Sequence, residues 1–434
     1  MPTIRSFHTI PGITVVIALL SILAGVPVAA QEISVSGVID TVQSLGLTDD
    51  YEVLDSRTRA IPTLEVSAES SRASVTARAE YNAAIPSRSG FELGEAWYEW
   101  ASGPIALTLG QQIITWGAAD GVTITDVICP HDMTAFSGLE YIDSRLPVDA
   151  VRIKLSQYNW DFDLIWIPVF TPTKLPIDTD NPLSEIAYPN TVTTQGYSLP
   201  VSYSIANSPH GIADGEYASR LSYSGSLLDV GICAFYGWDD LPRATKTLVV
   251  DSDSGQPTGI SVSTDWYRIA MLGADTSVPV GPIVFRFEGA FTHDRYFAVD
   301  GLGESRVGAS LKKNQIRGMA GLDWMPGDWT ITAQYIEDAV LNYETNLARD
   351  QFENGATLNV SRTFLRDTLE LSASGYLGLS NFDGYGNFSA TYDIDDNFSL
   401  AAGTDLFWGG PDNDGDYESY EKLTSVFLKG TYRF

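Results

Sequence analysis

Acid–base or nucleophilic catalysis would need a histidine held beside a serine, cysteine or carboxylate partner. The candidates are His131, His210 and His293, and all three fall in segments whose composition predicts loops. Only His131 has a carboxylate directly beside it, in the tripeptide Pro130-His131-Asp132. No HExxH, GxSxG or phosphate-loop pattern occurs. The sequence therefore predicts no catalytic residue and no enzymatic activity.

A cation site could be built from the carboxylates of the stretch PDNDGDYESYE, which contains Asp412, Asp414 and Asp416. An EF-hand loop that starts at Asp412 needs glycine at its sixth position and a carboxylate at its twelfth. Gly415 is instead the fourth residue and Leu423 the twelfth, so that pattern fails. A solvated acidic loop and a loosely held surface cation stay open as alternatives. We predict no dedicated metal site and no cofactor.

The segments that would position functional side chains are almost all strand-like, and no apolar helical stripe is longer than two turns. Apolar and polar residues alternate with period two over stretches of about ten residues, the length that a tilted strand needs to cross a bilayer. We predict eighteen such strands, with sixteen as the alternative. They span residues 33–41, 60–69, 73–81, 92–101, 104–114, 149–157, 160–170, 216–224, 227–237, 264–274, 282–292, 314–324, 328–338, 356–366, 368–378, 382–392, 397–408 and 423–434.

The connections between these strands alternate between tight turns, such as Ser102-Gly103, and long polar loops. Long loops are expected near 42–59, 115–148, 171–215, 238–263, 293–313, 339–355 and 409–422. Short periplasmic turns on one rim and long extracellular loops on the other are typical of a transmembrane β-barrel. An even strand number also places both ends of the barrel on the short-turn rim. The predicted fold class is therefore all-β, a transmembrane antiparallel β-barrel.

The two faces of each predicted strand differ in polarity. Between 149 and 157, for example, Val151 and Ile153 alternate with Arg152 and Lys154. A soluble sheet would turn the apolar face towards a core, whereas a membrane barrel turns it towards lipid and turns its charged face towards an aqueous lumen. Tryptophans favour the barrel because they gather at strand ends, where a membrane–water interface would lie. They are Trp100, Trp116, Trp160, Trp238, Trp324, Trp329 and Trp408.

The first 30 residues have the organisation of a secretory signal peptide. Arg5 precedes a short apolar core from Ile13 to Leu23, and a small-x-small cleavage site ends at Ala30. A membrane anchor is the alternative, but the core is short for a bilayer span. The barrel would then comprise residues 31–434. A formal net charge of −29 leaves no basic surface of the kind that binds nucleic acid.

Basic side chains on the inward faces are the best candidates for a functional role. Strand parity predicts that these line the lumen: Arg78, Arg152, Lys154, Arg220, Arg268, Arg286 and Arg317. Carboxylates of inward parity share the lumen with them: Glu80, Asp161, Asp163, Asp229, Glu288 and Asp323. Two hypotheses stay open. The charges form cross-strand ion pairs that only stiffen the wall, or a basic wall faces acidic residues and orients small polar solutes.

The loop 115–148 is predicted to fold into the lumen and to form the acidic side of a constriction. It follows the fifth strand and contains Asp120, Asp126, Asp132, Glu140 and Asp143. Cys129 lies in this loop, and Cys233 has inward parity on a later strand. A Cys129–Cys233 disulfide is one prediction, because the chain has two cysteines and the route out of the cytoplasm is oxidising. Two unpaired thiols are the alternative.

Two short motifs resemble sequences of known barrels. The chain ends in the alternating stretch SVFLKGTYRF, and its terminus Tyr432-Arg433-Phe434 resembles the assembly signal of Gram-negative outer-membrane proteins. The stretch LTLGQQIITWGAADGVTITDVICPHD resembles a strand-then-loop motif of porin-like families. Its motif residues are Gly110, Gln112, Trp116, Gly117, Pro130 and Asp132. The resemblance implies a Gram-negative outer-membrane β-barrel of the porin class.

This resemblance implies a location in the cell outer membrane and a set of partners. They are outer-membrane lipid and lipopolysaccharide, the barrel-assembly machinery, periplasmic chaperones and, if the protein forms a homotrimer, two further copies of the chain. The expected function is porin-like, passive diffusion of small hydrophilic solutes. The alternatives are a loop-plugged barrel that transports apolar substrates and a structural or adhesive surface protein.

Overall fold

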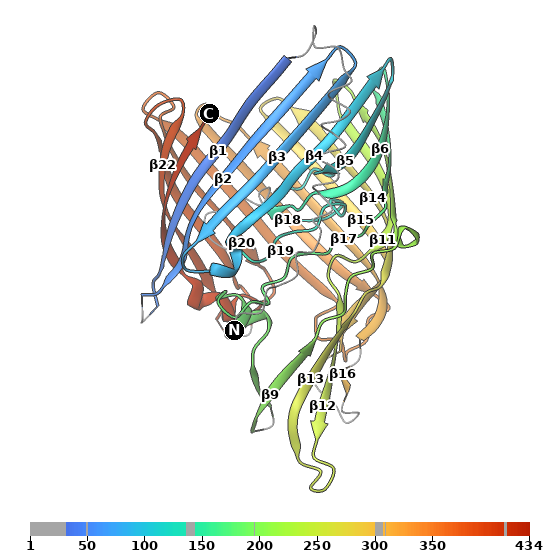
Figure 1. Ribbon diagram of the computed structural model, residues 1–434, viewed down its shortest axis with the longest axis vertical. Helices are drawn as coiled ribbons and strands as arrows, with labels where there is room; N and C mark the ends of the chain where they lie inside the picture. The colour runs from blue at the N-terminus through green and yellow to red at the C-terminus, as the bar shows by residue number, and fades with distance from the viewer. Residues whose placement is uncertain are drawn as a thin grey trace, which may run out of the picture.

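Over the residues that the computed structural model describes, eighteen antiparallel strands form a closed β-barrel (Figure 1). The structure describes residues 32–48, 51–135, 144–194, 196–299, 307–308, 310–411 and 415–434, so the predicted signal peptide, residues 1–30, lies outside this part of the chain. The barrel strands are β1 (Glu32–Gly46), β2 (Val53–Ala68), β3 (Ser71–Asn82), β4 (Gly90–Ser102), β5 (Ile105–Gln112), β6 (Val148–Gln157), β7 (Trp160–Ile167), β10 (Glu216–Ser224), β11 (Asp229–Trp238), β14 (Arg268–Val280), β15 (Ile283–Ala298), β17 (Ser310–Trp324), β18 (Trp329–Leu341), β19 (Phe352–Phe364), β20 (Leu369–Gly378), β21 (Gly384–Asp393), β22 (Phe398–Trp408) and β23 (Ser425–Arg433).

Each of the eighteen predicted strands coincides with one of these barrel strands, so the predicted fold class is confirmed. The period-two alternation explains the agreement. In a strand with one apolar and one polar face, both faces lie in an environment of matching polarity only if the sheet separates an apolar environment from a polar one. Each strand pairs with its neighbours in chain order, which is the simplest way to join antiparallel strands by tight turns.

The last strand closes the barrel by pairing with the first. β23 runs antiparallel to β1, with Tyr432 opposite Ile39. Phe434 adds two backbone hydrogen bonds with Gly37, of 3.0 Å and 3.1 Å. Its ring covers Gly37, where an added β-carbon would lie 2.7 Å from the ring. The ring centroids of Tyr432 and Phe434 are 6.2 Å apart. The backbone groups of Phe434 therefore still belong to the sheet.

The two rims of the barrel differ, as predicted. The turns at the upper rim of Figure 1 have at most four residues, and β1 begins at this rim. The lower rim carries the long connections. The predicted long loop 42–59 is wrong, because β1 continues to Gly46 and β2 starts at Val53. His293 likewise lies in β15 and not in a loop.

A second sheet, which has five strands among the described residues, projects from the long-loop rim (Figure 1). Its strands are β8 (Thr191–Thr194), β9 (Tyr197–Ser204), β12 (Arg243–Val250), β13 (Pro257–Asp265) and β16 (Val307–Gly308). They come from three connections predicted as loops. β9 and β13 run parallel, although they are far apart in the chain. Leu199, Ile260 and Val262 form the small apolar cluster that supports this sheet.

Helical structure in the described part of the chain is limited to short pieces in the long-loop connections. These are the 3₁₀ turn η2 (Pro86–Arg88), the single turn α2 (Ser184–Ala187), the 3₁₀ turn η4 (Ile212–Asp214) and the 3₁₀ segment η5 (Glu418–Leu423). None of these pieces has the length and apolar character that a membrane-crossing helix needs.

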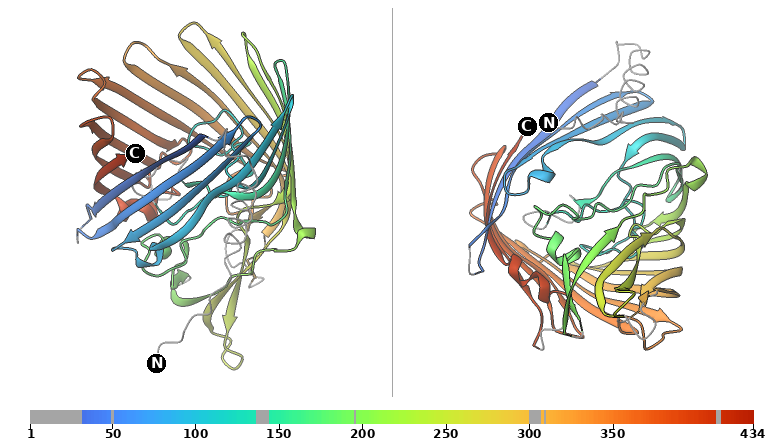
Figure 2. Two further views of the ribbon diagram at one scale, coloured as in Figure 1. Left: turned by 45° about the horizontal axis from the view of Figure 1, so that its top comes forward. Right: turned by 60° about the horizontal axis from the view of Figure 1, so that its bottom comes forward.

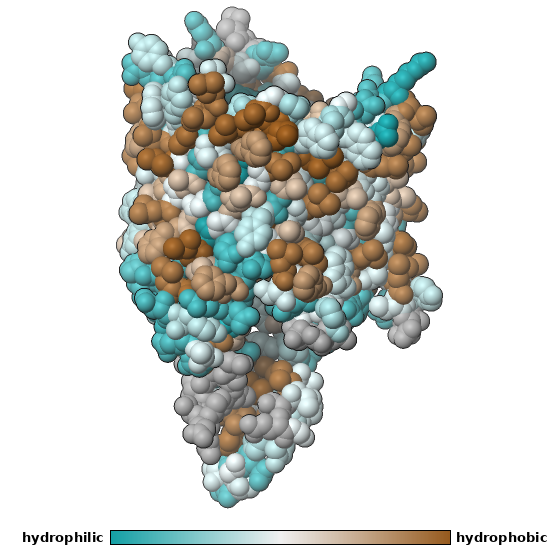
Figure 3. All heavy atoms as spheres, turned by 180° about the vertical axis from the view of Figure 1, so that it is seen from behind, coloured by the Kyte–Doolittle hydropathy of each residue, from teal (hydrophilic) through white to brown (hydrophobic). Residues whose placement is uncertain are grey.

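Apolar side chains are spread over the face of the barrel that Figure 3 shows, together with less hydrophobic ones. Leu272 and Leu428 are 64% and 65% exposed on the outer surface of the barrel. Trp100 and Trp324 are also exposed, at the short-turn ends of their strands. Trp116 does not follow this pattern, because it is buried inside the barrel at 5% exposure. The tryptophan distribution therefore marks the outer interface at strand ends, but not in the segment that follows β5.

The closing strand pair predicts that deletion of Phe434 impairs barrel assembly. The deletion removes two backbone hydrogen bonds, each worth about 1 kcal/mol, and the ring that covers Gly37. We expect a clear fall in the fraction of heat-modifiable, SDS-resistant protein recovered from membranes. Phe388→Ala removes an exposed ring from β21 and is the control that should assemble normally. Normal membrane levels of the deleted chain would contradict the assembly role of Phe434.

Candidate functional site

Residues 113–135, which we call the lumen segment, leave the barrel wall after β5 and lie inside the barrel. Figure 2 (right) looks in from the long-loop rim and shows this segment in teal within the ring of strands. Gly110 has a φ of +120°, and a β-carbon there would collide with the Ala96 carbonyl, so the bend at the end of β5 needs glycine. The Gln112 side chain donates a 3.2 Å hydrogen bond to the Ala150 carbonyl of β6. These two motif residues end the strand and turn the chain inward.

Glu288 of β15 fastens the lumen segment to the far wall. Its carboxylate accepts hydrogen bonds from the backbone N–H groups of Ala118 (2.5 Å), Ala119 (2.7 Å) and Thr125 (2.7 Å), and from the Thr125 hydroxyl (2.7 Å). Gly117 adopts a φ of +89° beside it, and a β-carbon there would collide with the carboxylate. A buried carboxylate is tolerated only when its oxygens are hydrogen-bonded, so Glu288 and the lumen segment stabilise each other.

Two further side chains of the far wall hold the same turn. Arg286 of β15 donates a 2.9 Å hydrogen bond to the Ala118 carbonyl. The Gln334 amide on β18 accepts from the Asp120 N–H at 2.9 Å and donates to the Asp120 carbonyl at 2.6 Å. β15 and β18 follow β5 by six and eight strands around the ring. The lumen segment therefore crosses the lumen and divides it.

Apolar side chains fill the space on one side of the lumen segment. The cluster combines the segment with inward-facing residues of the wall from β6 to β18. Its members from the segment are Ile114, Trp116, Ile124, Ile128 and Cys129, and its wall members include Ile165, Phe235, Met271, Met319 and Ile336. This side of the lumen is a packed core, with the density that protein interiors share.

Both cysteines belong to this packed core, but they are not joined to each other. Cys129 and Cys233 are 1% and 6% exposed, and both are free. The Cys129 sulfur accepts a 3.2 Å hydrogen bond from the Ile114 N–H, and burial raises the pKa of its thiol to about 12. The predicted Cys129–Cys233 disulfide is therefore not formed in the structure. The hydrogen bonds to Glu288 and the apolar packing hold the segment without a covalent link.

Asp126 and Asp132, predicted to face a constriction, are both buried beside a guanidinium group. Asp126 accepts a 3.0 Å hydrogen bond from the Trp116 N–H and pairs with Arg145, while its burial raises its pKa against the effect of both partners. Burial is the largest single influence on Asp132 and acts to raise its pKa, but Arg88 at 3.5 Å, the hydrogen bonds from Thr134 and the charge of Lys174 together lower the pKa. Both carboxylates stabilise the segment and present little charge to a solute.

Of the three constriction candidates that the structure describes, Asp120 has an exposed side chain, whereas Asp126 and Asp132 are buried. Its backbone is fixed to β18, so the carboxylate stands at a defined position on the turn of the segment. Glu140 and Asp143, which were predicted to share this role, lie outside the described residues. The described part of the segment therefore exposes less negative charge to the lumen than its number of carboxylates indicates.

Most of the predicted inward cations form ion pairs with carboxylates on other strands. The partner strand is adjacent in four pairs, whereas Arg220 of β10 reaches across β11 to Asp275 of β14. The pairs are Arg152 with Asp163 (2.8 Å), Lys154 with Asp161 (3.3 Å), Arg220 with Asp275 (2.6 Å), Arg286 with Asp323, and Arg317 with Asp338 (3.4 Å). All five cations face the lumen. Strand register brings the partners together, since Arg317 lies directly opposite Asp338. Of the two hypotheses, cross-strand pairing describes these side chains.

Arg268 points outward, and its predicted place in the lumen is wrong. It lies opposite Trp238, and its guanidinium covers the rings of Trp238 and Tyr236 at 4.4 Å and 5.2 Å from their centroids. Tyr236 is 50% exposed on the outer surface. The inward face of β14 carries Ile269 and Met271 instead. Because both faces of this strand are apolar, alternation alone could not identify the inward one.

Arg78 faces the lumen and has no carboxylate within ion-pair distance among the described residues. It shares the inward face of β3 with Glu80, which pairs with Arg88 at 3.0 Å. Across the strand it lies opposite Glu92, whose carboxylate instead pairs with Lys174 at 2.7 Å. Arg78 is therefore an inward cation whose charge no neighbouring carboxylate neutralises.

Two groups of inward residues were missed by the sequence analysis. Arg57 and Arg59 lie on β2, where they pair with Asp55 and Asp40, both at 2.7 Å. Strand parity would have identified them if 42–59 had been recognised as containing strand residues. The second group is an aromatic cluster in which neighbouring ring centroids are 5.0–6.4 Å apart. Its members are Tyr376, Tyr385, Phe407, Tyr417 and Tyr420.

The described residues contain no group of His, Cys, Asp and Glu side chains arranged to hold a metal ion. Asp412 and Asp414 of the acidic stretch lie outside them. His131 has its Nδ1 2.8 Å from the Ser144 hydroxyl. Burial, together with the nearby Arg145, lowers the pKa of His131 to about 4. Its imidazole is therefore neutral at ordinary pH and forms part of the packed loop.

The two free thiols predict a distinct labelling pattern. In the folded protein neither cysteine should react with a maleimide, because both are buried and the Cys129 pKa is high. After denaturation without reductant, we expect two labelled thiols per chain by mass spectrometry. A chain that takes up no label until reductant is added would contradict the free-thiol state.

The bonds to Glu288 predict that Glu288→Ala loosens the lumen segment. Hydrogen bonds to a charged group contribute about 1.5–3 kcal/mol each, and four are lost at once. We expect the Cys129 thiol to label at least ten-fold faster in the folded variant than in the wild type. Glu370→Ala, which removes an exposed carboxylate from β20, is the control. Equal labelling rates in the two variants would show that Glu288 does not hold the segment.

Solved structures with this fold share little sequence with the chain. OccAB1 of Acinetobacter baumannii matches with a TM-score of 0.52 and 9% identity, over 93% of this chain and 96% of that chain. OccK5 (OpdH) of Pseudomonas aeruginosa matches with a TM-score of 0.51 and 9% identity, over 93% and 98%. OccAB4 of Acinetobacter baumannii matches with a TM-score of 0.51 and 10% identity, over 94% and 98%. These likenesses confirm the predicted porin-like barrel fold.

No curated protein matches the sequence. The family model described as "Protein of unknown function (DUF1302)" matches residues 86–374, which is more than half of the chain. The matched region includes the strand-then-loop motif after β5, the lumen segment and Glu288 with the wall that holds it. The chain therefore belongs to the DUF1302 family.

Proposed function

We propose that the protein is an outer-membrane, porin-like channel for the passive diffusion of small hydrophilic solutes. A closed sheet leaves no unpaired backbone edge, which is the condition for strands to cross a bilayer. The apolar outer surface and the signal-peptide pattern of residues 1–30 support a place in the outer membrane. A barrel of this strand number encloses an aqueous lumen wherever a loop does not fill it.

The crossing of the lumen by the lumen segment is the observation that carries the proposal. The segment is held by Glu288 and Gln334 and packs against the wall from β6 to β18. A passage would then run along the other side, past the inward faces of β3 and β19–β21, because inward residues of β1, β2 and β22 such as Val42, Arg57 and Asp405 are buried. Such a passage is narrower than the whole barrel and has a lining of its own, which suits small solutes.

The polar side chains of the wall on that side support the proposal that the solutes are hydrophilic. The facing strands β19–β21 direct small polar side chains inward, and the hydroxyls of Ser372 and Ser389 lie 2.7 Å apart. Groups of this kind can replace water around a polar solute as it passes. The inward residues at these positions are Asn359, Ser361, Ser372, Ser374, Asn387, Ser389 and Thr391.

Two charges are proposed to act on solutes in this passage. Arg78 supplies a positive charge from β3, and Asp120 supplies a negative charge from the turn of the lumen segment. The cations Arg152, Lys154 and Arg220 contribute less, because each is paired with a carboxylate. The selectivity of the channel then depends on few residues, although the chain carries many charges.

A second candidate function is the transport of apolar or aromatic solutes through a loop-plugged barrel. The aromatic cluster of β20–β22 and η5 favours it, since Tyr376 and Tyr417 approach to 5.9 Å and Phe407 and Tyr420 also to 5.9 Å. Aromatic faces bind flat or apolar molecules by stacking. A structural or adhesive surface protein is a further candidate, favoured by the sheet that projects beyond the barrel rim.

As a channel, the protein would have no catalytic role. Its partners would be outer-membrane lipid and lipopolysaccharide on the outside of the barrel and small polar solutes on the inside. It would reach the membrane through periplasmic chaperones and the barrel-assembly machinery, which would read the Tyr432-Arg433-Phe434 terminus.

Planar-bilayer recordings of the refolded protein separate these candidates. A channel for hydrophilic solutes gives a stable, ohmic conductance step in simple salt. The variant Glu288→Ala should then show a larger or noisier step, because its lumen segment is released. Asp253→Ala, which removes an exposed carboxylate from the turn between β12 and β13 in the projecting sheet, should conduct as the wild type does. The absence of any conductance from folded, inserted wild type would reject the channel and leave the plugged or adhesive barrel.

The uncompensated charge of Arg78 predicts a change of ion selectivity in Arg78→Gln. A unit charge about 6 Å from a passing ion contributes about 0.7 kcal/mol in water, which corresponds to roughly a three-fold change in relative permeability. We expect the reversal potential in a salt gradient to move towards cations. The paired variant Arg152→Gln with Asp163→Asn keeps the net charge and should leave the potential unchanged. No shift in Arg78→Gln would place this residue outside the passage.

A further inference from the structure

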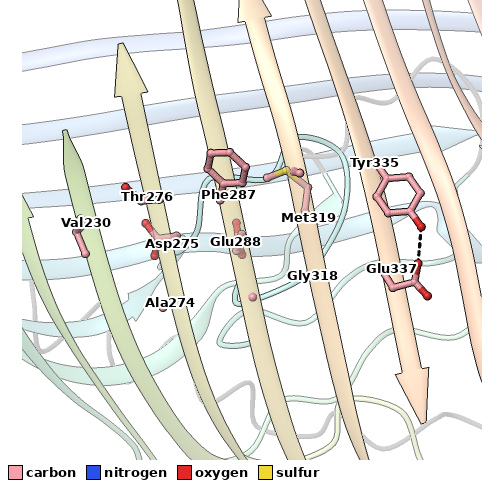
Figure 4. A pocket seen from close by; sticks show the side chains of 12 residues that line it. Val230, Ala274, Asp275, Thr276, Phe287, Glu288, Gly318, Met319, Tyr335 and Glu337 are labelled. Atoms are coloured by element: carbon pink, nitrogen blue, oxygen red, sulfur yellow. Dashed lines mark hydrogen bonds between the residues drawn. The ribbon is translucent and has the colours of Figure 1, made fainter. Parts of the chain in front are cut away.

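A groove of about 620 Å³ lies on the outer surface of the barrel, across β11 to β18 (Figure 4). Its floor consists of small residues on three successive strands. Ala274 lies opposite Gly289, which lies opposite Gly318, and Ala320 stands next along the same face. These residues share the outward face with Leu272, which is 64% exposed. The groove therefore opens to the surroundings of the barrel and not to its lumen.

The two glycines in the floor are not required by the backbone. A β-carbon added at Gly289 or at Gly318 would have its nearest heavy atom at 3.7 Å, which is ordinary van der Waals contact. Neither residue has a positive φ. This differs from Gly110 and Gly117, where the fold itself excludes a side chain. At positions 289 and 318 the effect of glycine is to hollow the outer surface.

A polar patch borders this groove. Glu337 lies on the outward face of β18, directly opposite Asn354 of β19. The Tyr335 hydroxyl donates to the Glu337 carboxylate, as Figure 4 shows, and also interacts with the Asn354 side chain. Glu337 has no cationic partner among the described residues. We call Tyr335, Glu337 and Asn354 the outer polar patch.

The outer polar patch lies within the apolar band and not at its edge. On the same outward faces, Phe352 and Leu358 flank Asn354 along β19, and they are 55% and 53% exposed. Ile316 of β17 is 45% exposed beyond the groove. Figure 3, the view from behind, shows teal surface enclosed by brown on the barrel. Lipid chains offer no hydrogen-bond donor, so a carboxylate and an amide facing them are unfavourable.

We propose that the groove and the outer polar patch form the contact surface for a second copy of this chain. Copies inserted in the same orientation present the same residues at the same depth. The patch contains both halves of a hydrogen bond, because the Asn354 amide of one copy can donate to the Glu337 carboxylate of the next. Leu272, which protrudes beside the groove, supplies a side chain that can fill the groove of the neighbour.

The chemistry of the patch selects a protein partner over lipid. A lipid chain could fill the hollow above Gly289 and Gly318, but it would leave Glu337 and Asn354 without partners. A second copy satisfies both requirements, since it brings apolar side chains and hydrogen-bonding groups to the same depth. The inference goes beyond the proposed channel function and uses only its placement of the barrel in a membrane.

Native mass spectrometry of protein extracted from membranes in mild detergent tests this contact. We expect the wild type to appear at a multiple of the chain mass. Gly318→Leu fills the groove, and Glu337→Leu with Asn354→Leu removes the hydrogen bonds; each should raise the monomer fraction at least ten-fold. Ala402→Leu, at an exposed small residue on the outward face of β22, is the matched control and should leave the oligomer intact.

The readouts also separate failure of the contact from failure of the channel. Each variant should keep its heat-modifiable gel shift and single-channel conductance, since all the changes point outward. A monomeric wild type, or both groove and patch variants as oligomeric as the wild type, would overturn the contact. The contact would also be overturned if the wild type were a monomer with bound lipid and the Gly318→Leu variant had lost that lipid. Protein that forms no inserted barrel at all would instead reject the channel.

Discussion

The pairing of β23 with β1 is the constraint on which the rest of the structure depends. Seventeen strand pairs between consecutive strands could also form an open sheet, which would leave two long edges with unpaired backbone groups. The eighteenth pair removes both edges and creates an inside and an outside. Every inward or outward side chain described above has its environment because of this pair. The two hydrogen bonds of Phe434 to Gly37 extend it to the end of the chain.

Inside the closed ring, the organisation rests on the carboxylate of Glu288. Its strand position directs it into the lumen, where it is 5% exposed and would be costly without partners. The lumen segment supplies those partners from its backbone, and in return its own buried N–H groups are satisfied. Gly117 makes the close approach possible. The apolar core then forms between the segment and the wall. The hydrogen bonds to Glu288 therefore position the apolar side chains that pack there.

Local pairing limits the electrostatic effect of a strongly acidic composition. The inward cations of β6, β10, β15 and β17 each meet a carboxylate one or two strands away, and Asp126 and Asp132 are buried against arginines. Such pairs cancel most of each other's field at a distance. The field in the proposed passage then depends on residues that lack a partner, such as Arg78, more than on the total charge of the chain.

The sequence by itself determined the strand number, the polarity of most strand faces and the place where the chain enters the lumen. Each of these follows from local patterns: period-two alternation, turn residues and the motif around Gly110 and Gln112. Where alternation was weak, inference from the sequence failed. Alternation does not identify the face of Arg268, because both faces of its strand are apolar, and it does not reveal the strand residues within 42–59.

Only the tertiary structure decided which distant residues meet. The parallel pairing of β9 with β13, the four hydrogen bonds to Glu288 and the separate burial of Cys129 and Cys233 all join segments far apart in the chain. Alternation records which side of a strand is apolar, but it carries no information about the partner across the lumen. The physical reason is that a strand's face is set by neighbouring residues in the chain, whereas a buried carboxylate finds its donors only after the ring has closed.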